Sequence, residues 1–406
     1  MKKKTNDELV FLPLGGSGEI GMNLNLYGYG PEANREWLVV DVGVTFGDLS
    51  TPGVDVIVPD PAFLEGEAIR GIVLTHAHED HIGALGWLWS RMKAPLYATP
   101  FTAFLIREKL REAGILDQVK LIEVPLGGTI DLGPFQVTMV TMTHSIAEPN
   151  GLAIKTPLGT VLHTGDWKID NDPVVGERTD VDFIQKLGDE GVLAMVCDST
   201  NVFVDGVAGS EGEVKVKLAE LIQGLKGRVA VGCFASNVAR MHSVISAAEA
   251  AGRRVALAGR SMHRITAAAK SVGMLNDIKP FLSEQEAKVW PADEILYLCT
   301  GSQGEARAAL LRVGLDLDPS RRVEELGQGA YRYSPAADYH GLDTFTYLAR
   351  DTSGLTATGV VSVLVKPVND PPRLEPQTVT LNRNRSADVF YAARDVDGDT
   401  LAFQVV

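Results

Sequence analysis

Short apolar stretches separated by glycine and proline dominate residues 8 to about 165. The strand-like stretches are "LVFLPL", "EWLVVDVGV", "RGIVLT", "PLYAT", "FQVTMVTMT", "GLAIKT" and "TVLHTGD". Their length and their Gly and Pro boundaries are typical of β-strands. Two longer stretches, "HIGALGWLWSRM" and "PFTAFLIREKLREAG", have helical periodicity instead. This part of the chain is therefore expected to mix sheet and helix.

From about residue 192 to 300 the pattern becomes a regular alternation of strand and helix. "VLAMVCD", "RVAVGCF" and "RRVALAG" are continuous apolar runs, and the helical stretches "EVKVKLAELIQGL" and "NVARMHSVISAAEAA" separate them. Strands that are apolar on both faces are typical of a parallel sheet covered by helices. We therefore predict βαβ units in this segment.

Beyond about residue 312 the apolar positions alternate with a period of two and no helical periodicity remains. The alternating positions are Phe345, Tyr347 and Ala349, followed by Val361, Val363 and Val365. Thr and Tyr are frequent here, which favours antiparallel strands. The pattern predicts a β-sandwich, and after "VNDPP" a second unit of the same kind begins.

The composition indicates a folded protein of two or three domains, because 45% of the 406 residues are hydrophobic. Cys197, Cys233 and Cys299 each lie in or just after an apolar run, as buried free thiols do, which fits a reducing cytosol. No run approaches the 18 apolar residues of a membrane span, and the first residues lack a signal-peptide core. We therefore expect a soluble, cytoplasmic protein that does not bind membranes.

The charge is unevenly distributed along the chain. The formal net charge of −14 argues against non-specific nucleic-acid binding. Between Lys226 and Lys270, however, eight Lys or Arg residues stand against one acid, Glu249, which gives a local balance of +7. An anionic partner at this segment is therefore compatible with the sequence.

The stretch "HAHEDH", residues 76–81, holds three histidines and two acids. His76 and His78 alternate along an extended segment that follows a strand, whereas Asp80 and His81 lie where that segment enters a helix. Ligands from these two places can converge on a pair of metal ions about 3.5 to 4 Å apart, as in two-metal hydrolases. The spacing favours two metal ions over one.

This stretch resembles the signature of the metallo-β-lactamase superfamily, whose further ligands come from later strand ends. They match His144 in "TMTHSI" and Asp166 in "LHTGDWKID", and Asp41 in "VVDVGV" matches a supporting acidic position. Further phrases resemble the bacterial ribonuclease J family: "LVFLPLGGSGEIGMNLNLYGYG", "HSIAEP", "HTGDWKID", "CDSTN", "FASNVARM" and "TGSQGEARAAL". This resemblance covers residues 8 to about 311.

The resemblance implies a zinc-dependent ribonuclease that hydrolyses RNA phosphodiester bonds both exonucleolytically, from 5′ to 3′, and endonucleolytically, in RNA processing and decay. His76, His78 and His144 would hold one Zn²⁺ and Asp80 and His81 the other, with Asp166 bridging the two. Asp80, Asp166 and Asp198 would be the catalytic acids, Asp198 matching the first acidic motif of the β-CASP insertion.

The β-CASP insertion of this family clamps single-stranded RNA over the metal ions. The matching candidate RNA- and phosphate-binding residues are Ser236, Asn237, Arg240, Ser302 and Gln303. As isolated motifs, Ser- and Gly-rich turns of this kind are common in loops. Their order after the metal motif strengthens the assignment to RNA binding. A homo-oligomer, as in the family, is also implied.

The resemblance ends soon after Ala309. Family members continue through the rest of the insertion and supply a last metal-binding histidine, so we expect a truncated enzyme with an incomplete second zinc site and impaired activity. The remaining histidines, among them His163 and His340, are poor candidates for that ligand, because a ligand also needs supporting hydrogen bonds.

The tail resembles the cadherin-like tandem repeats of bacterial surface proteins, in which "V-N-D-x-P" closes a repeat. Acids between such repeats bind Ca²⁺, so the candidate calcium ligands are Asp370, Asp395, Asp397 and Asp399. A solvated turn is the alternative interpretation of these acids. A ribonuclease joined to an adhesion repeat would be a natural fusion, a misjoined reading frame or a chimera.

The expected fold class is α/β: a metallo-β-lactamase αββα fold with a partial β-CASP βαβ insertion, followed by a cadherin-like β-sandwich tail. The expected domains are the metallo-β-lactamase domain (1–200), the partial β-CASP domain (201–312), a charged linker (313–326), one cadherin-like repeat (327–370) and the start of a second (371–406).

Two other functions compete with the ribonuclease. One is another metallo-β-lactamase-fold hydrolase acting on a thioester or lactone, although the long βαβ insertion argues against a small substrate. The other is a non-enzymatic, calcium-binding adhesion module, which only the tail supports. The amount of zinc and calcium per chain would discriminate among the three.

Overall fold

The computed structural model divides the chain into two compact units, residues 1–303 and residues 304–406. The residues that the structure describes are 7–47, 50–302, 309–310, 322–327, 330–335, 339–350, 356–366, 368–369, 371–374, 378–389, 393–395 and 400–404.

A six-stranded sheet forms the first layer of the N-terminal unit, with the order β1-β2-β3-β6-β7-β8. Its strands are β1 (Glu8–Gly15), β2 (Leu24–Gly30), β3 (Glu36–Val40), β6 (Ala68–Val73), β7 (Leu96–Ala98) and β8 (Leu121–Glu123). The first three strands pair antiparallel, and β3 to β8 pair parallel. A small hairpin of β4 (Thr45–Phe46) and β5 (Val56–Ile57) stands apart from this sheet.

A five-stranded sheet forms the second layer, with the order β13-β12-β11-β10-β9. Its strands are β9 (Thr129–Leu132), β10 (Phe135–Thr141), β11 (Asn150–Thr156), β12 (Gly159–His163) and β13 (Ala194–Val196). All pairs are antiparallel except β12 with β13. The run "VLAMVCD" was predicted to open the later βαβ segment, which was wrong: its strand, β13, lies parallel to β12 and completes this sheet.

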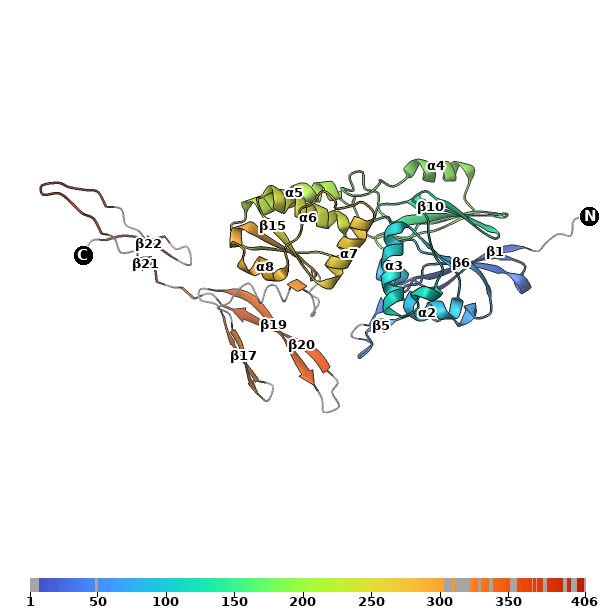
Figure 1. The fold of residues 1–406 in the computed structure, drawn as a ribbon, viewed down its shortest axis with the longest axis horizontal. Helices are drawn as coiled ribbons and strands as arrows, with labels where there is room; N and C mark the ends of the chain where they lie inside the picture. Colours follow the sequence, from blue (N-terminus) through green and yellow to red (C-terminus); the bar gives the residue numbers. More distant parts are fainter. Residues whose placement is uncertain are drawn as a thin grey trace, which may run out of the picture. The chain divides into compact units, whose positions relative to one another are not determined.

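The two sheets face each other, and helices cover their outer faces. In β3, Leu38 and Val40 pack between the sheets, whereas Trp37 and Val39 face the helices, so the strand is apolar on both sides. The helices over the first sheet are α1 (Glu79–Ile82), α2 (Leu85–Met92) and α3 (Pro100–Glu112); α4 (Val181–Glu190) covers the second. Figure 1 shows α2 and α4 on opposite sides of the paired sheets. The predicted αββα architecture is confirmed.

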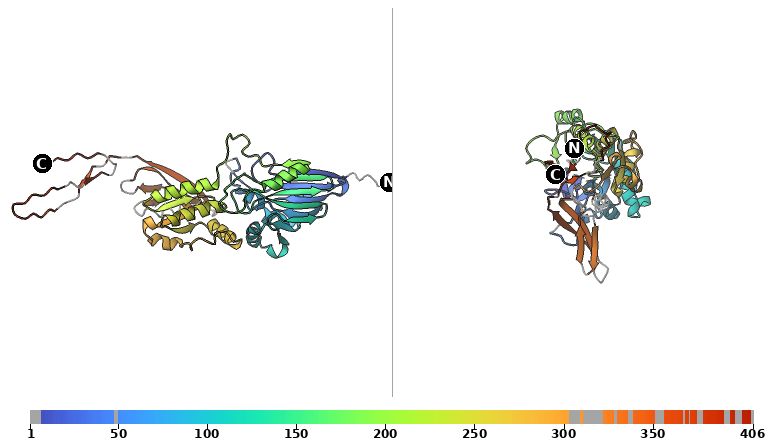
Figure 2. Two further views of the ribbon diagram at one scale, coloured as in Figure 1. Left: turned by 90° about the horizontal axis from the view of Figure 1, so that it is seen from above. Right: turned by 90° about the vertical axis from the view of Figure 1, so that its left-hand side faces the viewer.

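A three-stranded parallel sheet with helices forms the βαβ part of the same unit, as predicted. Its strands are β14 (Val229–Gly232), β15 (Arg254–Ala258) and β16 (Ile295–Cys299), in the order β14-β16-β15. Its helices are α5 (Glu211–Gly224), α6 (Val238–Ala250), α7 (Arg260–Ser271) and α8 (Glu284–Val289). Helix α7 packs against α3, where Arg264 forms an ion pair with Glu112 at 2.7 Å. Figure 2 shows the unit from two further directions.

The described residues of the C-terminal unit form antiparallel strand pairs, as the period-two pattern predicts. The pairs are β17 (Arg322–Gly327) with β18 (Ala330–Ser334), β19 (Gly341–Arg350) with β20 (Thr356–Val365), and β21 (Arg373–Leu374) with β22 (Ala393–Arg394). The linker predicted over 313–326 is wrong at its end, because residues 322–326 belong to β17.

None of the helices in the described part of the chain has the length and apolar character needed to cross a bilayer.

Candidate metal centre

The residues of "HAHEDH" lie where β6 gives way to helix α1. Strand β6 ends at Val73, and the following segment is still extended at His78, with φ −69° and ψ 153°. His78 occupies the position before the first helical residue, and Asp80 and His81 lie in the first turn of α1. Strand, extended segment and helix therefore present the side chains to one place, as the spacing predicted.

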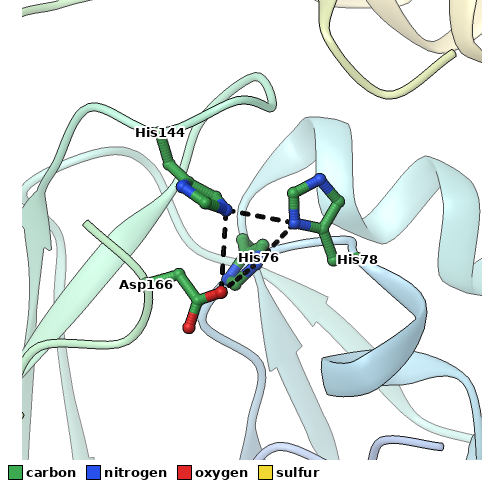
Figure 3. A group of neighbouring side chains, drawn as sticks. All are labelled: His76, His78, His144 and Asp166. Carbon is green, nitrogen blue, oxygen red and sulfur yellow. Dashed lines mark hydrogen bonds and ion pairs between the residues drawn. The ribbon is translucent and has the colours of Figure 1, made fainter. Parts of the chain in front are cut away.

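Four side chains form the first donor group: His76, His78, His144 and Asp166. His144 follows β10 and Asp166 follows β12. The Nδ1 atom of His78 lies 3.1 Å from Nε2 of His76 and 3.2 Å from Nε2 of His144. Figure 3 shows the rings and the carboxylate converging on one point. Four potential metal-ligating atoms therefore lie within 4.8 Å of one another.

Three side chains form the second donor group: Asp80, His81 and Asp166. His81 Nε2 lies 3.5 Å from Asp80 Oδ2 and 3.3 Å from Asp166 Oδ1. The other oxygen of Asp166, Oδ2, lies 3.6 Å from His144 Nε2 in the first group. Asp166 thus directs one oxygen to each group, which is the arrangement of a bridging ligand.

Burial keeps the histidines of the first group neutral. It lowers the pKa of His76 well below the usual value, and it lowers the pKa of His78 to about 4 and that of His144, while charges on neighbouring histidines act in the same direction. Neutral imidazole nitrogens with free lone pairs are what a metal ion needs, whereas three protonated rings at these distances would repel one another. Imidazole and carboxylate donors at these positions fit a divalent transition-metal ion.

The second group is electrostatically different. Burial alone would lower the pKa of His81, but the nearby carboxylates of Asp41, Asp166 and Asp80 raise it well above the usual value. For Asp166, burial is outweighed by its hydrogen bond to His81 and by the histidine charges, which lower its pKa to about 2. A metal ion entering this group must therefore displace a proton from His81.

Asp41, the predicted supporting acid, is buried beneath the second group. Its Oδ2 accepts a hydrogen bond from His81 Nδ1 at 2.8 Å, and its Oδ1 accepts one from the backbone N–H of Thr75 at 2.8 Å. Bonding at Nδ1 leaves Nε2 of His81 to face Asp80 and Asp166. The close fit extends to Gly43, where a Cβ atom would lie 1.6 Å from the carbonyl oxygen of Asp80.

The sequence interpretation gave no role to Asn23, which supports the second donor group, or to Tyr27, which contacts the buried His163 outside both groups. The side-chain amide of Asn23 donates to the carbonyl oxygen of Asp80 at 3.1 Å and lies 3.3 Å from His81 Nε2. Tyr27 Oη lies 2.9 Å from Nδ1 of the buried His163. Asn23 belongs to the "GGSGEIGMN" phrase, which had been noted as a family likeness without a role for this residue.

The predicted catalytic acid Asp198 lies outside both donor groups. Its carboxylate accepts from the backbone N–H of Thr200 at 3.0 Å, and its own N–H donates to Thr164 Oγ1 at 3.0 Å. The contact with Thr164 places Asp198 next to the loop that carries Asp166. The charge of Asp198 raises the pKa of His144, but burial of His144 lowers that pKa by more.

Three of the predicted RNA-binding residues, Ser236, Asn237 and Arg240, lie together at the start of α6, and their side chains have different partners. Ser236 lies at the first donor group, with Oγ 3.1 Å from His78 Nε2. The side chain of Asn237 accepts from the backbone N–H of Arg240 and caps α6. The Arg240 guanidinium is paired with Glu211. Ser302 is exposed after β16, and Gln303 lies outside the described residues.

Several basic side chains of the segment from Lys226 to Lys270 make contacts within the fold. Arg253 is buried and donates to the carbonyl oxygens of Gly227 and Ile295. Arg254 lies over the Trp290 ring at 5.7 Å. The local balance of +7 therefore overstates the charge that is free to meet a ligand.

A cavity of about 210 Å³ opens beside the first donor group. His144 and Lys168 line it from the αββα part, and Asn237 and Val238 line it from the βαβ part. Both parts of the N-terminal unit thus contribute to a concave surface next to the candidate metal centre.

Of the candidate calcium ligands, Asp370, Asp397 and Asp399 lie outside the described residues, and Asp395 directly follows β22. Calcium binding by the tail stays a prediction.

The buried histidines predict acid sensitivity of the metal-free protein. His78 and His163 have pKa values lowered to about 4, chiefly by burial, while in the unfolded chain they would bind a proton near pH 6.5. The unfolded state therefore binds more protons between pH 6.5 and 4, and stability falls as the pH falls through this window. His81 has a raised pKa and is therefore protonated in both states below about pH 6.5, so its effect on the pH dependence of stability lies above this window.

With a chelator present, we expect the unfolding temperature to fall by at least about 5 °C between pH 7 and pH 5. Calorimetry of the unsubstituted chain would measure this fall. His163→Gln should flatten the profile, whereas His263→Ala, which removes an exposed histidine on α7, should leave it unchanged. An unfolding temperature that stays constant or rises toward pH 5 would contradict the neutral state of these histidines.

Comparison with known families agrees with the geometry. Residues 39–184 match the family described as Beta-lactamase superfamily domain, and residues 226–324 match Ribonuclease J, beta-CASP domain. Residues 309–364 match Bacterial Ig domain. The tail was predicted to be cadherin-like; the match names the Ig domain, which shares the β-sandwich architecture. The β-CASP match also extends beyond residue 311, where the resemblance was expected to end.

Curated proteins share long alignments with the chain. A ribonuclease J of Sinorhizobium meliloti is 50% identical over 313 residues, which cover 77% of this chain and 56% of that protein. A ribonuclease J of Corynebacterium glutamicum is 42% identical, over 74% of this chain and 42% of that protein. Ribonuclease J2 of Bacillus subtilis is 34% identical, over 80% and 58%. The chain spans about half the length of these relatives.

Among solved structures, a protein of unknown function from Enterococcus faecalis has a TM-score of 0.50 at 15% identity, covering 73% of this chain and 78% of that one. This likeness concerns the fold alone.

Proposed function

Because residues 39–324 of the chain belong to the ribonuclease J family, we propose that the chain is a zinc-dependent ribonuclease that hydrolyses phosphodiester bonds of single-stranded RNA. The observation that carries this proposal is the pair of donor groups joined by Asp166. A two-metal centre of this kind suits phosphodiester hydrolysis, since two cations can act on the attacking and leaving oxygens of one phosphorus. Exonucleolytic and endonucleolytic cleavage both belong to this proposal.

The donor groups define what each residue would do. His76, His78 and His144, with Asp166 Oδ2, would hold one Zn²⁺; Asp80 and His81, with Asp166 Oδ1, would hold the other. When bound, the zinc ions supply positive charge that stabilises the phosphoryl oxygens in the transition state. Asp41 fixes the tautomer of His81, and burial keeps the three histidines of the first group ready to bind metal at neutral pH.

The βαβ part favours a nucleic-acid substrate over a thioester or lactone. It lines the cavity beside His144 through Asn237 and Val238, so that the concave surface has walls from both parts of the unit. Lys168 lies on the same surface and can contribute positive charge next to the metal centre, although Asp170 pairs with it at 2.8 Å. A polyanionic strand crossing the metal ions would meet this surface.

A cleavage assay would test the proposal. The purified chain with Zn²⁺ should cleave a 5′-labelled single-stranded RNA, and a chelator or the variant His76→Ala should abolish cleavage. The control His242→Ala changes a histidine on α6 that is outside both donor groups and should retain activity. Full RNA cleavage by metal-stripped His76→Ala would refute the proposal, and hydrolysis of thioester or lactone substrates without RNA cleavage would favour the other hydrolase class.

A further inference from the structure

The outer nitrogen of His78 is held by a residue from the βαβ part. Ser236, in the loop between β14 and α6, places its Oγ 3.1 Å from Nε2 of His78. The two residues are 158 positions apart in the chain. We propose that Ser236 is a positioning residue of the first metal site, so that the βαβ part builds this site as well as contacting substrate. The proposal rests on the metal binding proposed above, but not on RNA cleavage.

The direction of the hydrogen bond follows from the other ring nitrogen. Nδ1 of His78 faces His76 and His144, and it is the atom that a metal ion would take. Nδ1 must then carry the lone pair and Nε2 the proton, so His78 donates to the hydroxyl oxygen of Ser236. Such a bond fixes both the tautomer and the orientation of a ligating imidazole.

The loop that carries Ser236 is itself well anchored. The backbone N–H of Asn237 donates to the carbonyl oxygen of Phe234 at 3.2 Å, and that of Val238 donates to the carbonyl oxygen of Ser236 at 2.9 Å. The side chain of Asn237 caps α6 through the N–H of Arg240 at 2.8 Å. The position of Ser236 is therefore fixed by the start of α6.

A chain of polar contacts connects this helix start back to the other side of the metal centre. The guanidinium of Arg240 donates twice to Glu211, each time at 3.1 Å, and Glu211 is buried. The N–H of Glu211 donates to Asp170 Oδ2 at 3.0 Å, and the N–H of Asp170 donates to Thr143 Oγ1 at 3.2 Å.

Thr143 immediately precedes His144. His78 and His144 are thus tied to the same βαβ helices from two sides. The start of α5 is pressed against the loop after Asp170, because a Cβ atom on Gly212 would lie 1.8 Å from Asp172 Oδ2. Ser236 and Arg240 therefore make contacts that support the metal centre, whereas the sequence resemblance had suggested that they contact phosphate.

Zinc titration of the full chain without RNA would test the role of Ser236. Ser236→Ala should weaken the tighter zinc event by about 10- to 100-fold, the usual effect of removing a partner of a metal ligand, and should alter the absorption spectrum of the cobalt-substituted protein. Ser236→Thr keeps the hydroxyl and should restore both properties. Ser271→Ala is the matched control, because that hydroxyl on α7 bonds only to a backbone carbonyl of its own helix among the contacts that the structure gives it.

A double-mutant cycle would test the connection through α5 and α6. Glu211→Gln loosens the anchor of Arg240 and should weaken zinc binding less than Ser236→Ala, and its effect should shrink in the Ser236→Ala background, because both act through His78. Calorimetry of the metal-free variants shows whether they fold, and the Thr variant separates a lost hydroxyl from a general disturbance.

Unchanged zinc affinity and an unchanged cobalt spectrum in folded Ser236→Ala would overturn the proposal; weakened RNA binding in the same variant would then assign Ser236 to the substrate path. If the unsubstituted chain binds zinc without cleaving RNA, the proposed function fails, whereas the zinc titrations still decide the role of Ser236.

Discussion

Replacement of Asp166 by alanine is expected to abolish zinc binding at both donor groups and, with it, RNA cleavage. Asp166 directs Oδ1 to His81 and Oδ2 to His144, so one substitution removes a ligand from each group. It also removes a carboxylate whose negative charge stabilises the protonated form of His81. Since the loss of a mere partner of a ligand costs about 10- to 100-fold, loss of the bridging ligand should lower activity by more than about 100-fold.

Zinc content and RNA cleavage rates of purified variants would measure this effect. Asp189→Ala removes an exposed aspartate on α4 and serves as the control. His76→Ala should lose the first site only, so the two variants should differ in their residual zinc. If Asp166→Ala keeps the zinc content of the unsubstituted chain, Asp166 does not bridge the two groups.

The second large effect is expected at Asp41. Its carboxylate is buried, accepts hydrogen bonds from His81 Nδ1 and from Thr75, and has a left-handed backbone with φ 64°. Breaking a buried charged pair typically destabilises a fold by about 3 to 5 kcal/mol. Asp41→Asn is the informative variant, because asparagine also tolerates this backbone conformation and so isolates the carboxylate charge.

We expect Asp41→Asn to lower the free energy of unfolding and to weaken zinc at the second group by about 10- to 100-fold, with little change at the first. Denaturant unfolding and zinc titration would measure the two effects. Equal losses at both groups would show that Asp41 supports the whole fold rather than the orientation of His81.

The parts of the site that are close in sequence could be predicted, and the parts that meet only in the fold could not. "HAHEDH" lies within six residues, so its spacing alone indicates a metal site. His144, Asp166 and Asp41 were identified only through the family resemblance, because nothing in their local sequence distinguishes them from other His and Asp residues. The contact between Ser236 and His78 depends on how two parts of the fold pack, which no local pattern encodes.

The hydrophobic periodicity likewise predicted local elements but not how they pack against one another. The apolar run "LAMVC" correctly indicated a strand, but periodicity shows which face is buried and not which strand lies alongside; β13 pairs with β12 instead of opening the βαβ sheet. Charge counting was misleading at Arg240 for a related reason. A basic residue in a basic segment suggests a phosphate contact, yet its partner, Glu211, lies 29 positions earlier in the chain.

Calorimetric titration of Zn²⁺ into the metal-free chain would show whether the two donor groups form two unequal metal sites. The first group offers three neutral histidines and a carboxylate, whereas the second offers three donors, shares Asp166 and must displace a proton from His81. We expect one strong binding event per chain, lost in His76→Ala, and a weaker event that releases a proton. Two equally strong events, or a strong event that persists in His76→Ala, would contradict this expectation.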